Sequence, residues 1–253
     1  MFNWLRNKRR DHYKRTGITS AEINIISAKA PITRKVPDSL RRDFYETVAV
    51  FVKEKNFEGC GGLELTNEIE LTIASHASLL LLGGISDYYP DLFSILVYPS
   101  PYIAPVRDMQ EDGVIVEGRE LRHGESWGQG SLVLAWDEAA SDSKNPNSGR
   151  NLIIHEFSHE IDQEFGLTEA ATLEAYPEWG TIIKGSYEDH LNNVDFDRPT
   201  LLDPYGATDL AEFFAVSTEA FFGVPDKLKQ RHPQLYQQIA NVYNLDPASW
   251  KRI

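Results

Sequence analysis

One short motif limits what this 253-residue chain can fold into more than any other feature: His155-Glu156-Phe-Ser-His159, which has the pattern His-Glu-x-x-His. Residues four apart lie on one face of an α-helix, so both imidazoles can bind the same metal ion. Apolar residues on both sides of the motif predict a buried helix with one polar face. Glu156 would then lie beside the metal, where it can take a proton from a bound water.

Two neutral imidazoles and a carboxylate suit zinc, and a catalytic zinc keeps one position open for water. The alternative is a helix whose two histidines cap or pair at the surface. A third ligand is needed, and the common continuation with a glycine and a third histidine is absent, because position 162 is Asp and position 165 is Phe. The ligand must therefore come from a later helix, and four residues are candidates: Glu212, Glu219, His190 and His232.

Glu212 is the favoured third ligand, because it lies in the most apolar helix of the C-terminal half. A carboxylate there is costly unless it is paired or binds a metal. Glu219 follows two turns later on the same face and is expected to orient a metal-binding imidazole. Asp162, one turn after His159, is a second candidate for that role. His190 and His232 have charged sequence surroundings, which predict exposed side chains.

The composition indicates a cytoplasmic protein. The single cysteine, Cys60, excludes an intrachain disulfide and favours a reducing compartment. The N-terminus lacks the apolar run of a secretory signal, and the four consecutive leucines at 79–82 are too few to span a bilayer. No membrane insertion is expected.

Charge divides the chain into two unequal parts. Residues 1–16 carry six basic side chains and one acidic one, a net charge of +5; the whole chain carries −13, so the remainder carries −18. This acidic remainder argues against nucleic acid as a partner. The basic segment could touch anionic lipid, RNA or an acidic protein, but a flexible segment is the preferred interpretation. Residues 17–253 are predicted to form a single domain.

Periodicity predicts an α+β fold, mostly helical, with a small β-sheet next to the metal-binding helix. Apolar spacing indicates helices at 37–55, 67–82, 177–192 and 209–222, and two short helices after 225. Short β-branched and aromatic runs indicate strands at 93–98, 113–116 and 131–136. The last of these, as an edge strand, could bind an extended peptide through main-chain hydrogen bonds. Residues 17–36 and 137–150 are predicted to be irregular, and His76 is expected to face the core.

The metal motif, Tyr205 and the run Ala211-Glu212-Phe-Phe-Ala215 together resemble the Mlc titration factor A family of zinc peptidases. That family is structurally related to the catalytic domain of anthrax lethal factor. The resemblance extends over roughly residues 15–250. It implies a zincin-type domain with one zinc ion held by His155, His159 and Glu212. It further implies that Glu156 is the general base and that Tyr205 helps to stabilise the oxyanion.

The resemblance also implies a function: cytosolic aminopeptidase-type hydrolysis of peptides or proteins, together with binding of a transcriptional repressor. The alternative is a regulatory protein that sequesters such a repressor, with the peptidase activity secondary or latent. An aminopeptidase needs an acidic group for the free α-amine, and three residues remain open for that role: Glu117, Asp137 and Glu138.

Overall fold

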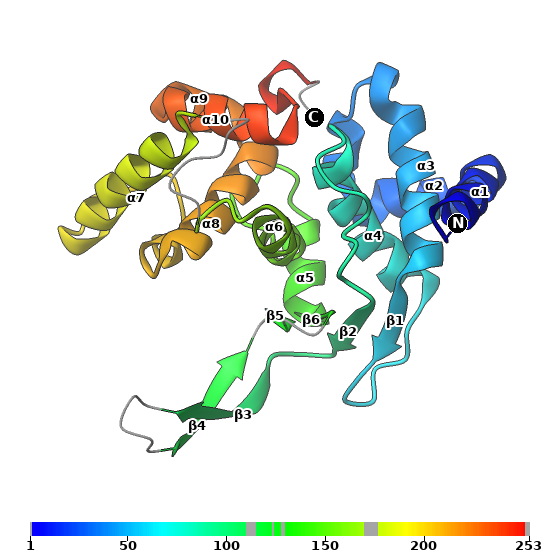
Figure 1. Ribbon diagram of the computed structural model, residues 1–253, viewed down its shortest axis with the longest axis horizontal. Coiled ribbons are helices and arrows are strands. Elements are labelled where there is room, and N and C mark those ends of the chain that lie inside the picture. The colour runs from blue at the N-terminus through cyan, green and yellow to red at the C-terminus, as the bar shows by residue number, and fades with distance from the viewer. Residues whose placement is uncertain (1, 110–114, 123, 128–129, 170–176, 251–253) are drawn as a thin grey trace.

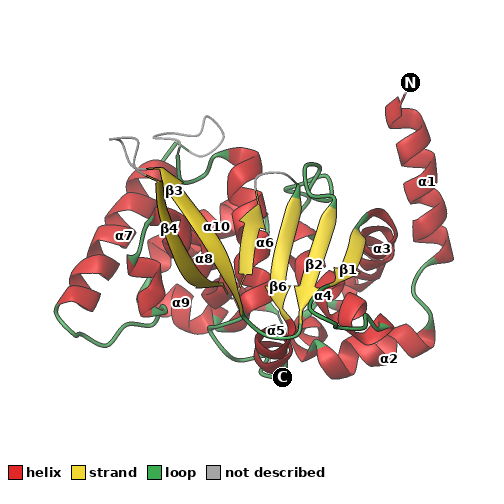
Figure 2. Cartoon of the chain, turned by 90° about the horizontal axis from the view of Figure 1, so that it is seen from below, coloured by secondary structure: helices red, strands yellow, loops and turns green. Residues whose placement is uncertain are grey.

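The computed structural model describes residues 2–109, 115–122, 124–127, 130–169 and 177–250. The helices pack over one face of a small four-stranded sheet, and a two-stranded hairpin extends away from this body (Figures 1 and 2). The predicted mostly helical fold with a small sheet is therefore confirmed. Within the described residues, no helix combines the length and the apolar character needed to cross a membrane.

The four-stranded sheet has the order β1-β2-β6-β5. Its first three strands are parallel, whereas β5 is antiparallel to β6 and forms the edge. The strand predicted at 131–136 is thus internal, and its expected role as an edge strand was wrong. The missed neighbour β5 takes the edge position and lies against α6. The strands are β1 (Asn56–Gly59), β2 (Ser94–Tyr98), β5 (Gly124–Trp127) and β6 (Ser131–Ala135).

The hairpin is a separate antiparallel sheet of β3 (Tyr102–Met109) and β4 (Ile115–Arg122). Tyr102 pairs with Arg122 at its base. The strand predicted at 113–116 begins outside the described residues, and the described strand there runs on to Arg122. Local β-propensity therefore located a strand but not its partner or its length.

Most helices match their predictions closely. His76 on α4 is fully buried, as expected, and its Nδ1 atom lies 2.8 Å from the carbonyl oxygen of Thr72. The two short C-terminal helices are separated at His232-Pro233, also as predicted. The matching helices are α3 (Asp38–Glu54), α4 (Asn67–Leu81), α7 (Trp179–Asp195), α8 (Leu210–Gly223), α9 (Pro225–Arg231) and α10 (Pro233–Tyr243).

Two segments predicted to be irregular are helical. Residues 20–29 form α2 (Ser20–Lys29), which begins with a reciprocal pair of hydrogen bonds between Thr19 and Glu22, the capping box. It is followed by the 3-10 helix η1 (Pro31–Lys35). Residues 136–143 form α5 (Trp136–Ser143), whose first turn carries two acidic side chains that complement the helix dipole. Short apolar runs interrupted by Pro31 and Pro37 concealed the start of α2, and polar composition concealed that of α5.

The basic N-terminal segment, predicted to be flexible, forms helix α1 (Phe2–Thr16). Arg10 anchors it: this side chain is 10% exposed, lies 2.8 Å from a carboxylate oxygen of Glu54 and also pairs with Asp87. Its guanidinium stacks 4.5 Å from the ring centre of Tyr88. These partners are distant in sequence, so the charge run alone could not predict that α1 packs against α3.

Candidate metal centre

The His-Glu-x-x-His motif lies on α6 (Leu152–Phe165), which is surrounded by other helices in Figure 1. The Asn151 side chain caps its first turn by accepting a hydrogen bond from the backbone of Ile154, and Gly166 ends it in the left-handed conformation at φ 61°. One turn separates His155 from His159, and their ring centres lie 4.9 Å apart. The helix therefore presents both imidazoles to the same space.

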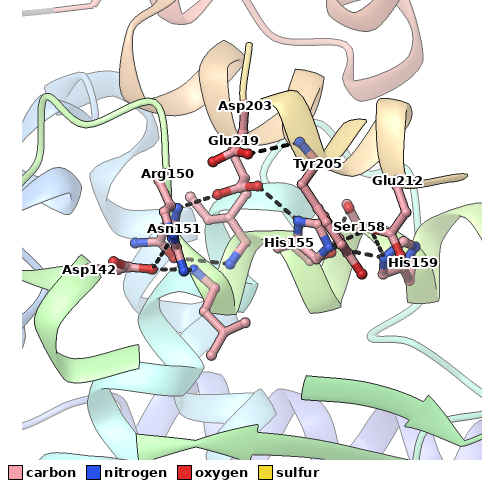
Figure 3. A network of polar contacts seen from close by, with 12 residues as sticks. Asp142, Arg150, Asn151, His155, Ser158, His159, Asp203, Tyr205, Glu212 and Glu219 are labelled. Atoms are coloured by element: carbon pink, nitrogen blue, oxygen red, sulfur yellow. Dashed lines mark hydrogen bonds and ion pairs between the residues drawn. The ribbon is translucent and has the colours of Figure 1, made fainter. Parts of the chain in front are cut away.

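Helix α8 supplies the facing carboxylates. Asp209 caps it by accepting a hydrogen bond from the backbone N–H of Glu212, 2.9 Å away. Its apolar face is fully buried and packs against α6, which brings the first turn of α8 over the two histidines. Figure 3 shows Glu212 and Glu219 pointing at α6 from this helix. Glu212, the favoured candidate, is thus the carboxylate that meets the motif.

Three potential ligand atoms converge at this point. The Glu212 Oε2 atom lies 2.9 Å from Nε2 of His155 and 3.5 Å from Nε2 of His159, and the two nitrogens are 3.3 Å apart. Tetrahedral zinc with bonds of about 2.0–2.1 Å places its ligand atoms about 3.3 Å from one another. The three side chains form the one His/Cys/Asp/Glu cluster with such spacing among the described residues. Their types and their spacing both fit a zinc ion.

Glu219 lies on the opposite side of the His155 ring. Its Oε1 atom is 2.8 Å from Nδ1 of His155, the position from which a carboxylate fixes the tautomer and orientation of a metal-binding imidazole. Its other oxygen accepts a hydrogen bond from the backbone N–H of Asn151. This role of Asn151 was not predicted from the sequence. The sequence signal that could have pointed to it is the asparagine directly before the metal-binding helix, a residue type typical of an N-cap.

Asp162 bonds to a different part of the chain. Its two carboxylate oxygens accept hydrogen bonds from the backbone N–H and the hydroxyl of Thr168, at 2.8 and 2.6 Å. These bonds hold the segment that follows α6. The hydrogen bonds of Asp162 are thus with Thr168 rather than with an imidazole of the motif, and its expected role in orienting an imidazole stays a prediction.

The charge states of His155 and Glu212 are strongly coupled. Burial disfavours the charged imidazole, but the hydrogen bonds to Glu212 and Glu219 outweigh burial and raise the pKa of His155 to about 10. Burial likewise disfavours the carboxylate of Glu212, yet the two histidines lower its pKa to about 2. Without a metal, a proton on His155 supplies the positive charge that these carboxylates require. A bound cation would take the place of that proton.

The pKa of Glu156 is shifted in the opposite direction from that of Glu212. Its side chain is buried, and burial raises its pKa to about 7 despite the nearby histidines, which lower it. A carboxyl group that titrates near neutral pH can both accept and return a proton. This pKa suits a general base beside a metal-bound water.

Tyr205 lies next to the metal cluster, on the short 3-10 helix η2 (Pro204–Ala207) between α7 and α8. Its ring centre is 6.0 Å from that of His155, and Figure 3 shows the phenol alongside this imidazole. His190, predicted to be exposed, is only 5% exposed, because the η2 segment covers it. His190 lies outside the metal cluster, as does the half-buried His232.

Comparison with known proteins agrees with this geometry. Residues 2–244 match the family model described as glucose-regulated metallo-peptidase M90. The chain belongs to this family. The Mlc titration factor A of Klebsiella pneumoniae is 30% identical over 230 residues, which are 88% of this chain and 85% of that protein. The same-named protein of Serratia proteamaculans is 31% identical, over 78% of this chain and 76% of that protein.

An uncharacterised protein of Synechocystis sp. is 36% identical over 230 residues, which cover 88% of this chain and 83% of that protein. The family resemblance drawn from the motif is therefore confirmed over most of the chain. Membership of a metallo-peptidase family implies a metal ion, and the His155, His159 and Glu212 cluster is where the described residues could hold it.

Proposed function

We propose that this M90 metallopeptidase is a zincin-type, zinc-dependent peptidase of the aminopeptidase type. Its one zinc ion would be held by His155, His159 and Glu212. The observation that carries the proposal is the convergence of these three ligand atoms, from two helices, at separations of 2.9 to 3.5 Å. When bound, zinc supplies Lewis-acid polarisation of the scissile carbonyl and acidifies a water molecule.

The residues of the chain would perform the remaining steps. Glu156 takes a proton from the attacking water and later returns it to the leaving amine. Its pKa of about 7 allows both transfers near neutral pH. Glu219 holds the ring of His155 through Nδ1. The hydroxyl of Tyr205 would donate a hydrogen bond to the oxygen on which negative charge develops.

Substrate binding is proposed at β5. Among the described strands, β5 pairs on one side only, and an extended peptide could add to its other side as a further strand beside α6. The group that holds the substrate amine remains open among the three earlier candidates. Glu138 lies 3.9 Å from Arg150, and Asp137 accepts a hydrogen bond from the backbone N–H of Glu138. The side chain of Glu117 is not among those that the structure describes.

A second candidate function is the binding of a transcriptional repressor. It is favoured by the relatives that bear the name Mlc titration factor A, a name that refers to the titration of a partner called Mlc. In this alternative the chain sequesters a repressor through its surface, and the peptidase activity is secondary or latent. Both functions can coexist, because repressor binding requires no turnover at the metal centre.

The test is hydrolysis of a panel of aminoacyl chromogenic substrates, with free and blocked amino groups, by the wild type and Glu156→Gln at equal zinc content. Removing the general base should lower turnover by about 10²–10⁴-fold while zinc stays bound. Glu188→Gln, the same change on the exposed part of α7, is the matched control and should remain active.

Full activity of Glu156→Gln would contradict the role of Glu156. Preference for blocked substrates would contradict the aminopeptidase type. A zinc-loaded wild type that cleaves none of the panel would favour the repressor-binding function.

A further inference from the structure

The place of Tyr205 is set by contacts from α7. Four local hydrogen bonds shape the segment 203–208, here called the Tyr205 loop; one of them runs from the backbone N–H of Thr208 to the Tyr205 carbonyl at 3.1 Å. Asp203 Oδ1 accepts from the backbone N–H of Tyr205 at 2.9 Å, and the Asp203 carbonyl accepts from Gly206 at 3.0 Å. The Thr208 hydroxyl donates to the Tyr205 carbonyl at 2.7 Å. These bonds fix the shape of the loop but not its distance from α6.

Two side chains of α7 attach the loop to the rest of the molecule. Nε2 of His190 lies 3.1 Å from the carbonyl oxygen of Asp203, and the hydroxyl of Tyr187 donates to the carbonyl oxygen of Ala207 at 3.4 Å. Residues 187 and 190 are three apart and share a helix face. A carbonyl only accepts, so His190 must carry its proton on Nε2. The two attachments lie on either side of Tyr205.

Packing holds the same loop against α8. A methyl group added to Gly206 would lie 2.5 Å from a methyl carbon of Val216 and 3.4 Å from Nε2 of His190, so nothing larger than glycine fits there. The ring of Phe213 lies 5.5 Å from His190 and 5.7 Å from Tyr187. Phe213 directly follows Glu212, so these contacts locate the loop relative to a proposed zinc ligand.

The Tyr205 side chain itself is 55% exposed, so burial of the phenol contributes little to its position. The position of the loop backbone therefore matters for where the phenol lies. We infer that His190 and Tyr187 are positioning residues, which hold the Tyr205 loop so that the phenol stays beside His155. This inference rests on the proposed function, since it gives α7 a part in the same reaction.

The experiment compares four variants at equal zinc content. Tyr205→Phe should lower kcat by about 10²-fold, as expected for loss of one donor to an oxyanion. His190→Leu removes the attachment and should lower kcat by about 10-fold with little change in KM, because small displacements of a positioned group are costly. His190→Gln, which keeps an N–H donor, should recover most of this loss. The double variant, which combines Tyr205→Phe with His190→Leu, should be no slower than Tyr205→Phe alone.

A second measurement does not depend on activity. Amide hydrogen exchange in the Tyr205 loop should be faster in His190→Leu than in the wild type, with and without zinc, while zinc affinity stays within about twofold because no ligand has changed. If His190→Leu does not fold, Tyr187→Phe removes only a hydroxyl and should give a smaller change of the same kind.

The outcomes separate this inference from the proposed function. Two outcomes would overturn the inference. One is that amide exchange in the Tyr205 loop is the same in His190→Leu and the wild type. The other is that His190→Leu lowers kcat by the same factor whether or not Tyr205 is replaced by Phe. A fully active Tyr205→Phe would instead overturn the role of Tyr205 in the reaction. An inactive wild type whose loop still loosens in His190→Leu would support the positioning contacts and contradict the peptidase proposal.

Discussion

Two clusters of charged side chains in this molecule differ in how their charge is balanced. Where α1 meets the body, the carboxylates of Glu54 and Asp87 are matched by Arg10, with Arg9 3.5 Å from Glu54. At the centre between α6 and α8, the carboxylates of Glu212 and Glu219 face imidazoles instead. A neutral imidazole carries no charge, so the positive charge must come from an added proton or from a metal ion. The first cluster is complete within the chain, and the second requires a cation.

This difference explains why one cluster is an anchor and the other a candidate reaction centre. Burying unbalanced carboxylates is costly, so the centre binds a proton on His155 when no metal is present. The same cost favours a metal ion over solvent once one is available. A buried excess of carboxylates around histidines is thus a stronger indication of a metal site than the motif alone.

The largest effect is expected at the metal centre. Glu219→Gln should lower zinc affinity by about 10–100-fold, the usual cost of losing a partner of a metal-binding imidazole, and Glu212→Gln should lower it further by removing a proposed ligand. Competition with a chromogenic chelator measures both. Equal affinities in the wild type and Glu212→Gln would exclude Glu212 as a ligand.

A large effect of another kind is expected at the anchor of α1. Arg10→Ala leaves the buried carboxylate of Glu54 without its main partner and should weaken the docking of α1 by about 3 kcal/mol. Hydrogen exchange over residues 2–16 measures this, with Arg15→Ala on the exposed face of α1 as the control. Zinc affinity should not change. A tenfold loss of zinc affinity in Arg10→Ala would show that the two clusters are coupled.

A moderate effect is expected from pH. The folded, metal-free protein keeps a proton on His155 up to about pH 10, whereas the unfolded chain loses it near 6.5, so this stabilisation is lost as pH rises. Burial lowers the pKa values of Lys35 and Lys55 to about 8, so these lysines stay mostly protonated at lower pH. Between pH 6.5 and 8, zinc must displace the proton on His155. Zinc affinity should therefore rise by roughly tenfold per pH unit.

Calorimetry at several pH values, with and without zinc, measures this linkage. The metal-free protein should lose stability across the window, and the zinc-loaded protein should lose less. A zinc affinity that does not depend on pH over the same interval would mean that His155 is already neutral without metal.

The smallest effect is expected at Asp162. Asp162→Asn should destabilise the fold by about 1 kcal/mol, because a carboxylate that accepts two hydrogen bonds from Thr168 becomes an amide that accepts fewer. Thermal unfolding and chelator competition check this together. A loss of zinc affinity like that of Glu219→Gln would show that Asp162 is a partner of the metal centre.

Local sequence signals located most helices of this fold, because their apolar spacing records a buried face. They failed at two helix starts: at Thr19-Glu22 for α2, where the apolar runs are short and interrupted by prolines, and at the polar first turn of α5. They also failed where long-range contacts decide the outcome. Arg10 finds its partners 44 and 77 residues away, and the edge of the sheet is set by the pairing of β5 with β6.

The sequence by itself determined the chemistry available to this protein: two imidazoles and a carboxylate on one helix, and two glutamates on an otherwise apolar helix that faces it. It also determined membership of a metallo-peptidase family. It predicted Glu212 as a metal ligand and Glu219 as the partner of a metal-binding imidazole, but not which histidine or which ring nitrogen each would meet. Only the packing of α8 on α6 directs Glu212 to Nε2 and Glu219 to Nδ1 of His155. The physical reason is that periodicity records which face of a helix is buried, whereas the relative placement of two helices depends on side chains from the whole core.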